Sequence, residues 1–67
     1  MQELGKTNSL VQARRLLDEI ATSGRWVAIR SGEHSVIYGK GDEELTVERK
    51  DSRVWLIVKY KKGEKDG

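Results

Sequence analysis

Apolar residues recur every three or four positions near the start of the chain. Over residues 9–23 they fall within an arc of about 140° on a helical wheel, the width of a face that packs on a core. These apolar positions are Leu10, Ala13, Leu16, Leu17, Ile20 and Ala21. Ser9 and Gln12 have the spacing of a capping box, and Gly24 fits a left-handed residue at the other end. The pattern predicts a helix from Ser9 to about Ser23.

Beyond this segment the apolar positions alternate, as they do in half-buried strands. Four segments rich in β-branched and aromatic residues follow one another: 25–30, 34–39, 44–49 and 53–61. The turns between them are short, and short turns join antiparallel neighbours because a parallel crossover needs about a dozen residues or more. The predicted fold class is α+β, with an N-terminal helix packed on one face of a four-stranded antiparallel meander (α-β-β-β-β).

The same pattern divides the chain into a domain and two ends. Residues 1–8 are expected to form a flexible lead-in, residues 9–61 a single α+β domain, and residues 62–67, which include no apolar side chain, a flexible tail. A chain of 67 residues supports only one small core. The sequence has no cysteine, which excludes disulfides and thiolate metal sites.

Two-residue turns would fix which face of the sheet each strand residue occupies. With such turns, three hairpins agree on one apolar face, which we expect to form the core beneath the helix. Its members are Val27, Ile29, Val36, Tyr38, Leu45, Val47, Val54, Leu56, Val58 and Tyr60. Water should cover the opposite face of a two-layer domain, so that face should be polar. Instead it would hold both tryptophans and two isoleucines.

This second face is the predicted functional site. The partner-binding residues expected there are Trp26, Ala28, Arg30, Ile37, Trp55, Ile57 and Lys59. Two tryptophan and two isoleucine side chains on one open face form a patch large enough to indicate binding. Strong curling of the sheet, or the tail folding over it, would instead bury the patch. We expect a small non-catalytic binding or regulatory module that presents this face to a protein partner, including a second copy of itself in a homodimer.

Single-stranded nucleic acid is the alternative partner, with Trp26 and Trp55 as stacking platforms flanked by Lys and Arg. The chain has 13 Lys and Arg against 11 Asp and Glu, a net charge of only +2. Glu44 and Glu48 would share the face with the tryptophans, whereas a phosphate backbone needs a positive stripe. The charge pattern therefore favours a protein partner over nucleic acid.

Residues typical of catalysis are few. His34 is the single histidine, and we expect it to pack near the first turn rather than to act as a base. The run from Gly39 to Glu44 lacks the spacing of a phosphate-binding loop, and its consecutive acidic side chains would point in alternating directions. We expect no enzyme, no metal and no cofactor. Without an apolar run of about 18 residues or a signal-peptide pattern, a soluble cytoplasmic protein with no membrane contact is expected.

Overall fold

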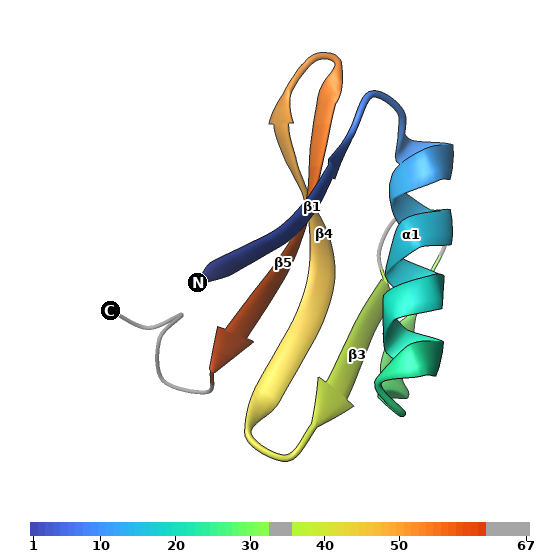
Figure 1. Cartoon of the computed structure of the whole chain (residues 1–67), viewed down its shortest axis with the longest axis vertical. Coiled ribbons are helices and arrows are strands. Elements are labelled where there is room, and N and C mark those ends of the chain that lie inside the picture. Colours follow the sequence, from blue (N-terminus) through green and yellow to red (C-terminus); the bar gives the residue numbers. More distant parts are fainter. Residues whose placement is uncertain (33–35, 62–67) are drawn as a thin grey trace.

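The computed structural model describes residues 1–32 and 36–61 (Figure 1). In chain order these residues form β1 (Gln2–Thr7), α1 (Leu10–Ser23), β2 (Val27–Ser31), β3 (Val36–Lys40), β4 (Glu43–Asp51) and β5 (Val54–Lys61). His34 and the predicted tail, residues 62–67, lie outside the described residues. In the described part of the chain, the helix is too short and too polar to cross a membrane.

The strands form one sheet in the order β1-β5-β4-β3-β2, with every neighbouring pair antiparallel. The helix lies along one side of this twisted sheet (Figure 1). This arrangement confirms the α+β class, the N-terminal helix and the antiparallel sheet. The predicted number of four strands is wrong, because Gln2–Thr7 forms a fifth strand on the outer side of β5. An edge strand gains backbone hydrogen bonds from its neighbour and needs few apolar side chains, so β1 has no strong sequence signal.

The helix begins where the sequence predicts. Ser9 has extended backbone angles, and its side-chain oxygen accepts the backbone N–H of Gln12 at 3.1 Å. The carbonyl oxygen of Ser9 accepts the N–H of Ala13 at 3.0 Å and the hydroxyl of Thr7 at 2.9 Å. The Thr7 bond ties the end of β1 to the first turn of α1. The N-cap is therefore both the start of the helix and the corner between strand and helix.

The helix ends differently from the prediction. Arg25, with φ of 60°, takes the left-handed position, whereas Gly24 has φ of −92°. The N–H of Trp26 donates to the carbonyl of Ala21 at 2.8 Å, and the N–H of Arg25 donates to that of Thr22 at 3.3 Å. This is a Schellman motif one residue beyond the expected glycine. Gly24 is instead required for space, since a Cβ there would lie 2.6 Å from the indole Nε1 of Trp26.

We expect Arg25→Gly to stabilise the protein by about 0.5–1 kcal/mol, because a left-handed backbone strains any residue with a Cβ. Urea unfolding followed by circular dichroism measures the change. The matched control is Arg15→Gly at an exposed position inside the helix, which we expect to cost about 1 kcal/mol. A loss of stability in Arg25→Gly would contradict the role assigned to this residue.

The core lies between the helix and the middle of the sheet. Its buried members are Ala13, Leu17, Ala21, Leu45 and Ile57, and partly buried side chains packed around them are Leu16, Ile20, Trp26, Val36, Tyr38, Val47 and Trp55. The helix packs on β4, β5 and β1. Tyr38 adds a polar link to this layer, since its hydroxyl donates to Oδ1 of Asp18 at 3.2 Å. Partial burial and the bond to Asp18 raise the pKa of Tyr38.

β3 and β4 turn the predicted side chains toward the helix, whereas β5 and β2, which lie on either side of this pair, do not. Val36 and Tyr38 of β3, and Leu45 and Val47 of β4, lie beneath the helix as expected. On β5, however, it is Ile57 that pairs with Val47 and shares its face. The predicted helix-side residues of β5, including Leu56 and Val58, point to the opposite face, as do Val27 and Ile29 of β2. The predicted core face is therefore wrong for both strands.

A one-residue shift in each hairpin causes this exchange. In the β4–β5 hairpin Asp51 pairs with Val54, and the register shifts between Arg49 and Asp51. In the β2–β3 hairpin the shift lies between Ala28 and Arg30. One extra residue moves every following side chain to the other face of the sheet. The two-residue turns assumed from the sequence contain no such bulges.

Candidate functional site

The predicted open face with two tryptophans does not exist in the structure. Ile57 is completely buried in the core, in contact with residues of the helix layer. Trp55 is half-buried and packs against the same cluster. The sequence predicts the open face for both side chains, because no residue type marks the bulge between Arg49 and Asp51. Trp55 and Ile57 therefore contribute to the fold, beneath the helix rather than opposite it.

The two tryptophans are also far apart. Trp26 follows the last turn of the helix, where its indole lies against Gly24. Trp55 pairs with Thr7, just before the first turn. The 14-residue helix between them is about 21 Å long, so the rings cannot form one stacking platform. Each ring instead has a cation over it: Lys40 Nζ is 5.9 Å from the centre of the Trp26 ring, and the Arg49 guanidinium is 5.6 Å from that of Trp55.

The face of the sheet opposite the helix is called the open face from here on. Of the seven predicted site residues, the structure brings Arg30 and Ile37 together on this face, as a directly opposed pair across β2 and β3. Ala28 is exposed, but it pairs with Tyr38 and so lies on the helix side of the sheet. Lys59 also lies on the helix side, opposite Leu45. Only Arg30 and Ile37 therefore keep the place that the sequence predicts for them.

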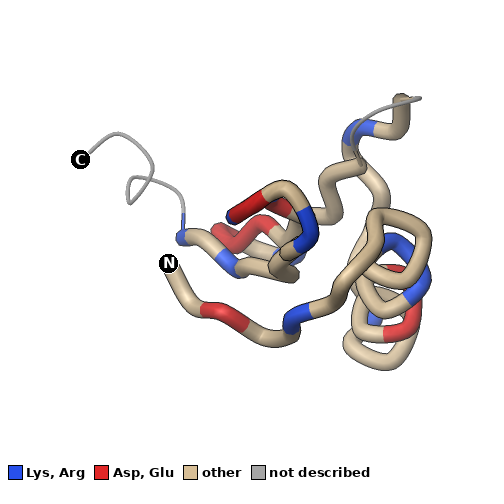
Figure 2. The backbone as a smooth tube through the Cα atoms, turned by 90° about the horizontal axis from the view of Figure 1, so that it is seen from above, with Lys and Arg blue, Asp and Glu red and all other residues tan. Residues whose placement is uncertain are grey.

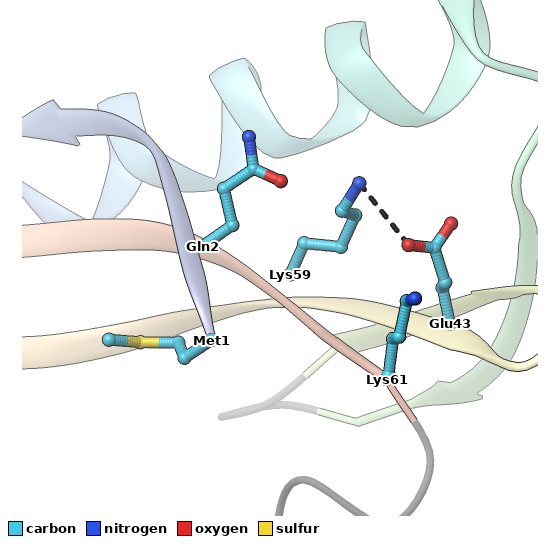
Figure 3. A pocket seen from close by; sticks show the side chains of 5 residues that line it. All are labelled: Met1, Gln2, Glu43, Lys59 and Lys61. Carbon is cyan, nitrogen blue, oxygen red and sulfur yellow. Dashed lines mark ion pairs between the residues drawn. The ribbon is translucent and has the colours of Figure 1, made fainter.

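Lys59 lines a hollow of about 200 Å³ where β1 begins and β5 ends (Figure 3). Its Nζ forms an ion pair with Glu43 Oε2 at 3.2 Å, and Gln2, Lys61 and Met1 complete the lining. Glu43 thus compensates the charge of Lys59. Glu43 and its neighbour Glu44 point to opposite faces of β4, as expected for consecutive strand residues. The described residues contain no cluster of three or more metal-binding side chains.

A tyrosine covers the middle of the open face. The hydroxyl of Tyr60 hydrogen-bonds to the carboxylate of Glu48. Tyr60 is in register with Glu44, whereas Glu48 is in register with Leu56, so the phenol ring must cross the Thr46–Val58 pair between them. Val58 is consequently fully buried although the helix lies on the other side. The hydrogen bond to Glu48, with a smaller effect of burial, raises the pKa of Tyr60 to about 12.

Among the described residues, two of the five exposed large apolar side chains lie together on β2, and the others are Met1, Leu4 and Val11. Every residue of this strand is exposed, with Val27 at 65% and Ile29 at 57%. Both lie on the open face beside Gly39 of β3: Val27 pairs with it directly, and Ile29 lies 3.2 Å from where a Cβ of Gly39 would be. The bulge turns Ile29 to this face. The two side chains form a small apolar surface at the free edge of the sheet.

Sequence reasoning missed Val27 and Ile29 because their alternation is equally typical of a core-facing strand. Both side chains point away from the helix because of the bulge between Ala28 and Arg30. Ordinary strand residues form this bulge, so no residue type in the segment marks it.

The charges within β2 and in the turn before it are of one sign. Residues 20–32 include Arg25 and Arg30 and no acidic residue. Neither guanidinium forms an ion pair or a hydrogen bond within the described residues. In register on the open face, the first carboxylate, Glu44, is two strands away from Val27, a distance of about 10 Å. Elsewhere the two signs interleave along the backbone of helix and sheet (Figure 2).

Comparison of the chain with protein-family models, with curated proteins and with solved structures gives no match. The functional argument therefore starts from the surface of the described residues. Its most distinctive region is the β2 surface, which we define as the free edge of β2 with Val27, Ile29, Arg25 and Arg30.

Proposed function

We propose that the chain is a small non-catalytic binding module that presents the β2 surface to a protein partner, a second copy of the chain included. One observation carries the proposal: all of β2 is exposed, with two branched aliphatic side chains among its five residues. Aliphatic side chains grouped beside unpaired backbone groups are the components of a protein interface. The proposal keeps the binding function expected from the sequence and moves its location from the Trp55 side to β2.

The two edges of the sheet support this choice. The β1 edge carries Glu3 and Lys6, charges of opposite sign, and its register shifts between Glu3 and Gly5. Charged side chains and bulges of this kind protect an edge from further pairing. Both bulges carry an exposed apolar residue, Leu4 at 37% on β1 and Ile29 at 57% on β2, and β2 adds Val27 at 65%. An edge that exposes more apolar area is the better candidate for a contact with another chain.

The test is a selection of peptides from a random display library on the immobilised protein. We expect the selected peptides to bind the wild type and to lose about tenfold or more in affinity with Ile29→Asp. The matched control is Val11→Asp, which alters an aliphatic residue on the helix that is 69% exposed, against 57% for Ile29. Light scattering of the same variants shows whether the partner is a second copy, because Ile29→Asp would then convert a dimer into a monomer.

Two results would overturn the proposal. One is a set of peptides, or a dimer, that tolerates Ile29→Asp but not Val11→Asp. The other is steeply salt-dependent binding of a labelled single-stranded oligonucleotide between about 50 and 200 mM salt, with no peptide binding. That second result would favour the nucleic-acid function considered from the sequence.

A further inference from the structure

We propose that β2 receives an extended acidic segment of another protein as a sixth strand of the sheet. This inference rests on the proposed function and names the class of partner. Its basis is the coincidence of three features in the β2 surface: an unpaired strand edge, two exposed aliphatic side chains and two arginines without a carboxylate partner among the described residues. These features match, in turn, the backbone, the aliphatic side chains and the carboxylates of a strand in which acidic and aliphatic residues alternate.

The backbone of β2 provides the first component. Its inner edge pairs with β3, and no strand of the described residues lies on its other side. The outward N–H and C=O groups of such an edge can pair with an added strand about 4.8 Å away. An added strand gains affinity from these main-chain bonds whatever its sequence. The side chains beside it then determine which sequences bind.

The side chains provide the other two components. Val27, Ile29 and Arg30 lie on the open face, because the bulge removes the usual alternation between Ile29 and Arg30. An added strand places every second side chain on that same face. An aliphatic residue beside Val27 and Ile29, followed by a carboxylate beside Arg30, satisfies both neighbours. Arg25, just before the strand, gives a second carboxylate a partner at the other end.

A second copy of the chain fits this edge less well. Two β2 strands related by a two-fold axis would place Arg30 of each copy beside the new ladder, and Val27–Ser31 contains no acidic residue to pair with it. They would also oppose two bulges in the middle of the new ladder, where the register already shifts. Like charges and interrupted pairing both weaken such a dimer. A flexible acidic segment brings no like charge and adds no second bulge to the ladder.

Single-stranded nucleic acid shares the negative charge but not the other components. Bases bind to exposed aromatic rings, whereas the exposed side chains between the two arginines are aliphatic. The nearest aromatic ring in sequence, Trp26, packs against the core and has Lys40 over it. Acidic peptide is therefore the occupant that the β2 surface favours.

The experiment uses the full chain and a fluorescein-labelled peptide of about ten residues in which valine and glutamate alternate. We expect binding by fluorescence polarisation that weakens as salt is added. In ¹H–¹⁵N spectra, the amide signals that shift most should be those of β2. A matched peptide with lysine in place of glutamate should not bind, since it would meet the two arginines with like charge.

The contribution of charge and the contribution of strand pairing are tested separately. Arg30→Glu should weaken binding about tenfold, whereas Arg53→Glu, the same charge reversal in the distant β4–β5 turn, should change it little. A peptide of the same sequence with alternate backbone nitrogens methylated should lose binding, because those nitrogens can no longer donate to β2. Circular dichroism of each variant verifies that the fold is intact.

The remaining outcomes overturn the inference in distinguishable ways. Equal binding of the methylated peptide would exclude strand addition, and equal binding of the lysine peptide would exclude the acidic partner. If neutral or basic library peptides bind and Ile29→Asp abolishes them, the proposed function holds while this inference fails. The same holds if the protein is a dimer that Ile29→Asp dissociates. Oligonucleotide binding in place of peptide binding would reject both the proposed function and this inference.

Discussion

Replacement of Ile57 by aspartate is expected to unfold the protein. Ile57 is fully buried between sheet and helix, in the same cluster as Leu17 and Leu45. An unpaired carboxylate there costs several kcal/mol, and a chain of this length has a total stability of about 3–10 kcal/mol. The sequence had predicted Ile57 for the open, partner-binding face, where the same change would leave the fold intact. This substitution therefore decides between the two orientations of β5.

The matched control is Ile29→Asp, which makes the same chemical change on the β2 surface. Ile29 is 57% exposed, so its aspartate variant should keep the far-ultraviolet circular dichroism and the urea midpoint close to those of the wild type. Ile57→Asp should show no cooperative urea transition. The opposite result, a folded Ile57→Asp with an unfolded Ile29→Asp, would restore the face assignment made from the sequence.

Removal of residues 1–7 has the second largest expected effect. These residues include β1, which pairs with β5 from Gln2 to Thr7, so the deletion turns the most buried strand of the sheet into an edge. It also removes the backbone that Leu16 packs against, since a Cβ at Gly5 would lie 2.7 Å from Cδ2 of Leu16. The lost burial and hydrogen bonds are comparable to the whole stability of a small domain. We expect the truncated chain to be unfolded at room temperature.

Thermal unfolding followed by circular dichroism measures this effect. The control is the double substitution of Glu3 and Lys6 by threonine, which removes the two charged side chains of β1 and favours a strand at both positions. We expect that variant to melt within a few degrees of the wild type. If the truncated chain melted at the same temperature as the wild type, residues 1–7 would be the loose lead-in that the sequence suggests.

The local elements were predictable because their signals are local. The helix follows from its apolar period and from Ser9, whose side chain caps the first turn as expected. Four of the five strands, all but β1, begin and end within two residues of the predicted segments. Val36, Tyr38, Leu45 and Val47 also face the helix as predicted, because no register shift interrupts the pairing of β3 with β4. The antiparallel arrangement followed from the short turns.

The site was less predictable than the strands. The face that a strand residue occupies depends on the exact register of every hairpin that connects its strand to the rest of the sheet. A single extra residue near Ile29, and another near Lys50, exchanged the faces of β2 and β5. Nothing in the composition of either segment marks the bulge, since both are formed by ordinary strand residues. Arg30 and Ile37 kept their predicted place, whereas Trp55 and Ile57 moved into the core.

By itself, the sequence determined the helix, the strands and the antiparallel class of this protein. These depend on the period of apolar residues, on capping and on turn length, which act over a few residues at a time. The tertiary structure alone decided that Gln2–Thr7 joins the sheet, that Ile57 is buried and that Val27 and Ile29 are left in water. Those outcomes depend on pairing between distant segments and on the two bulges, which decide the face that each side chain occupies.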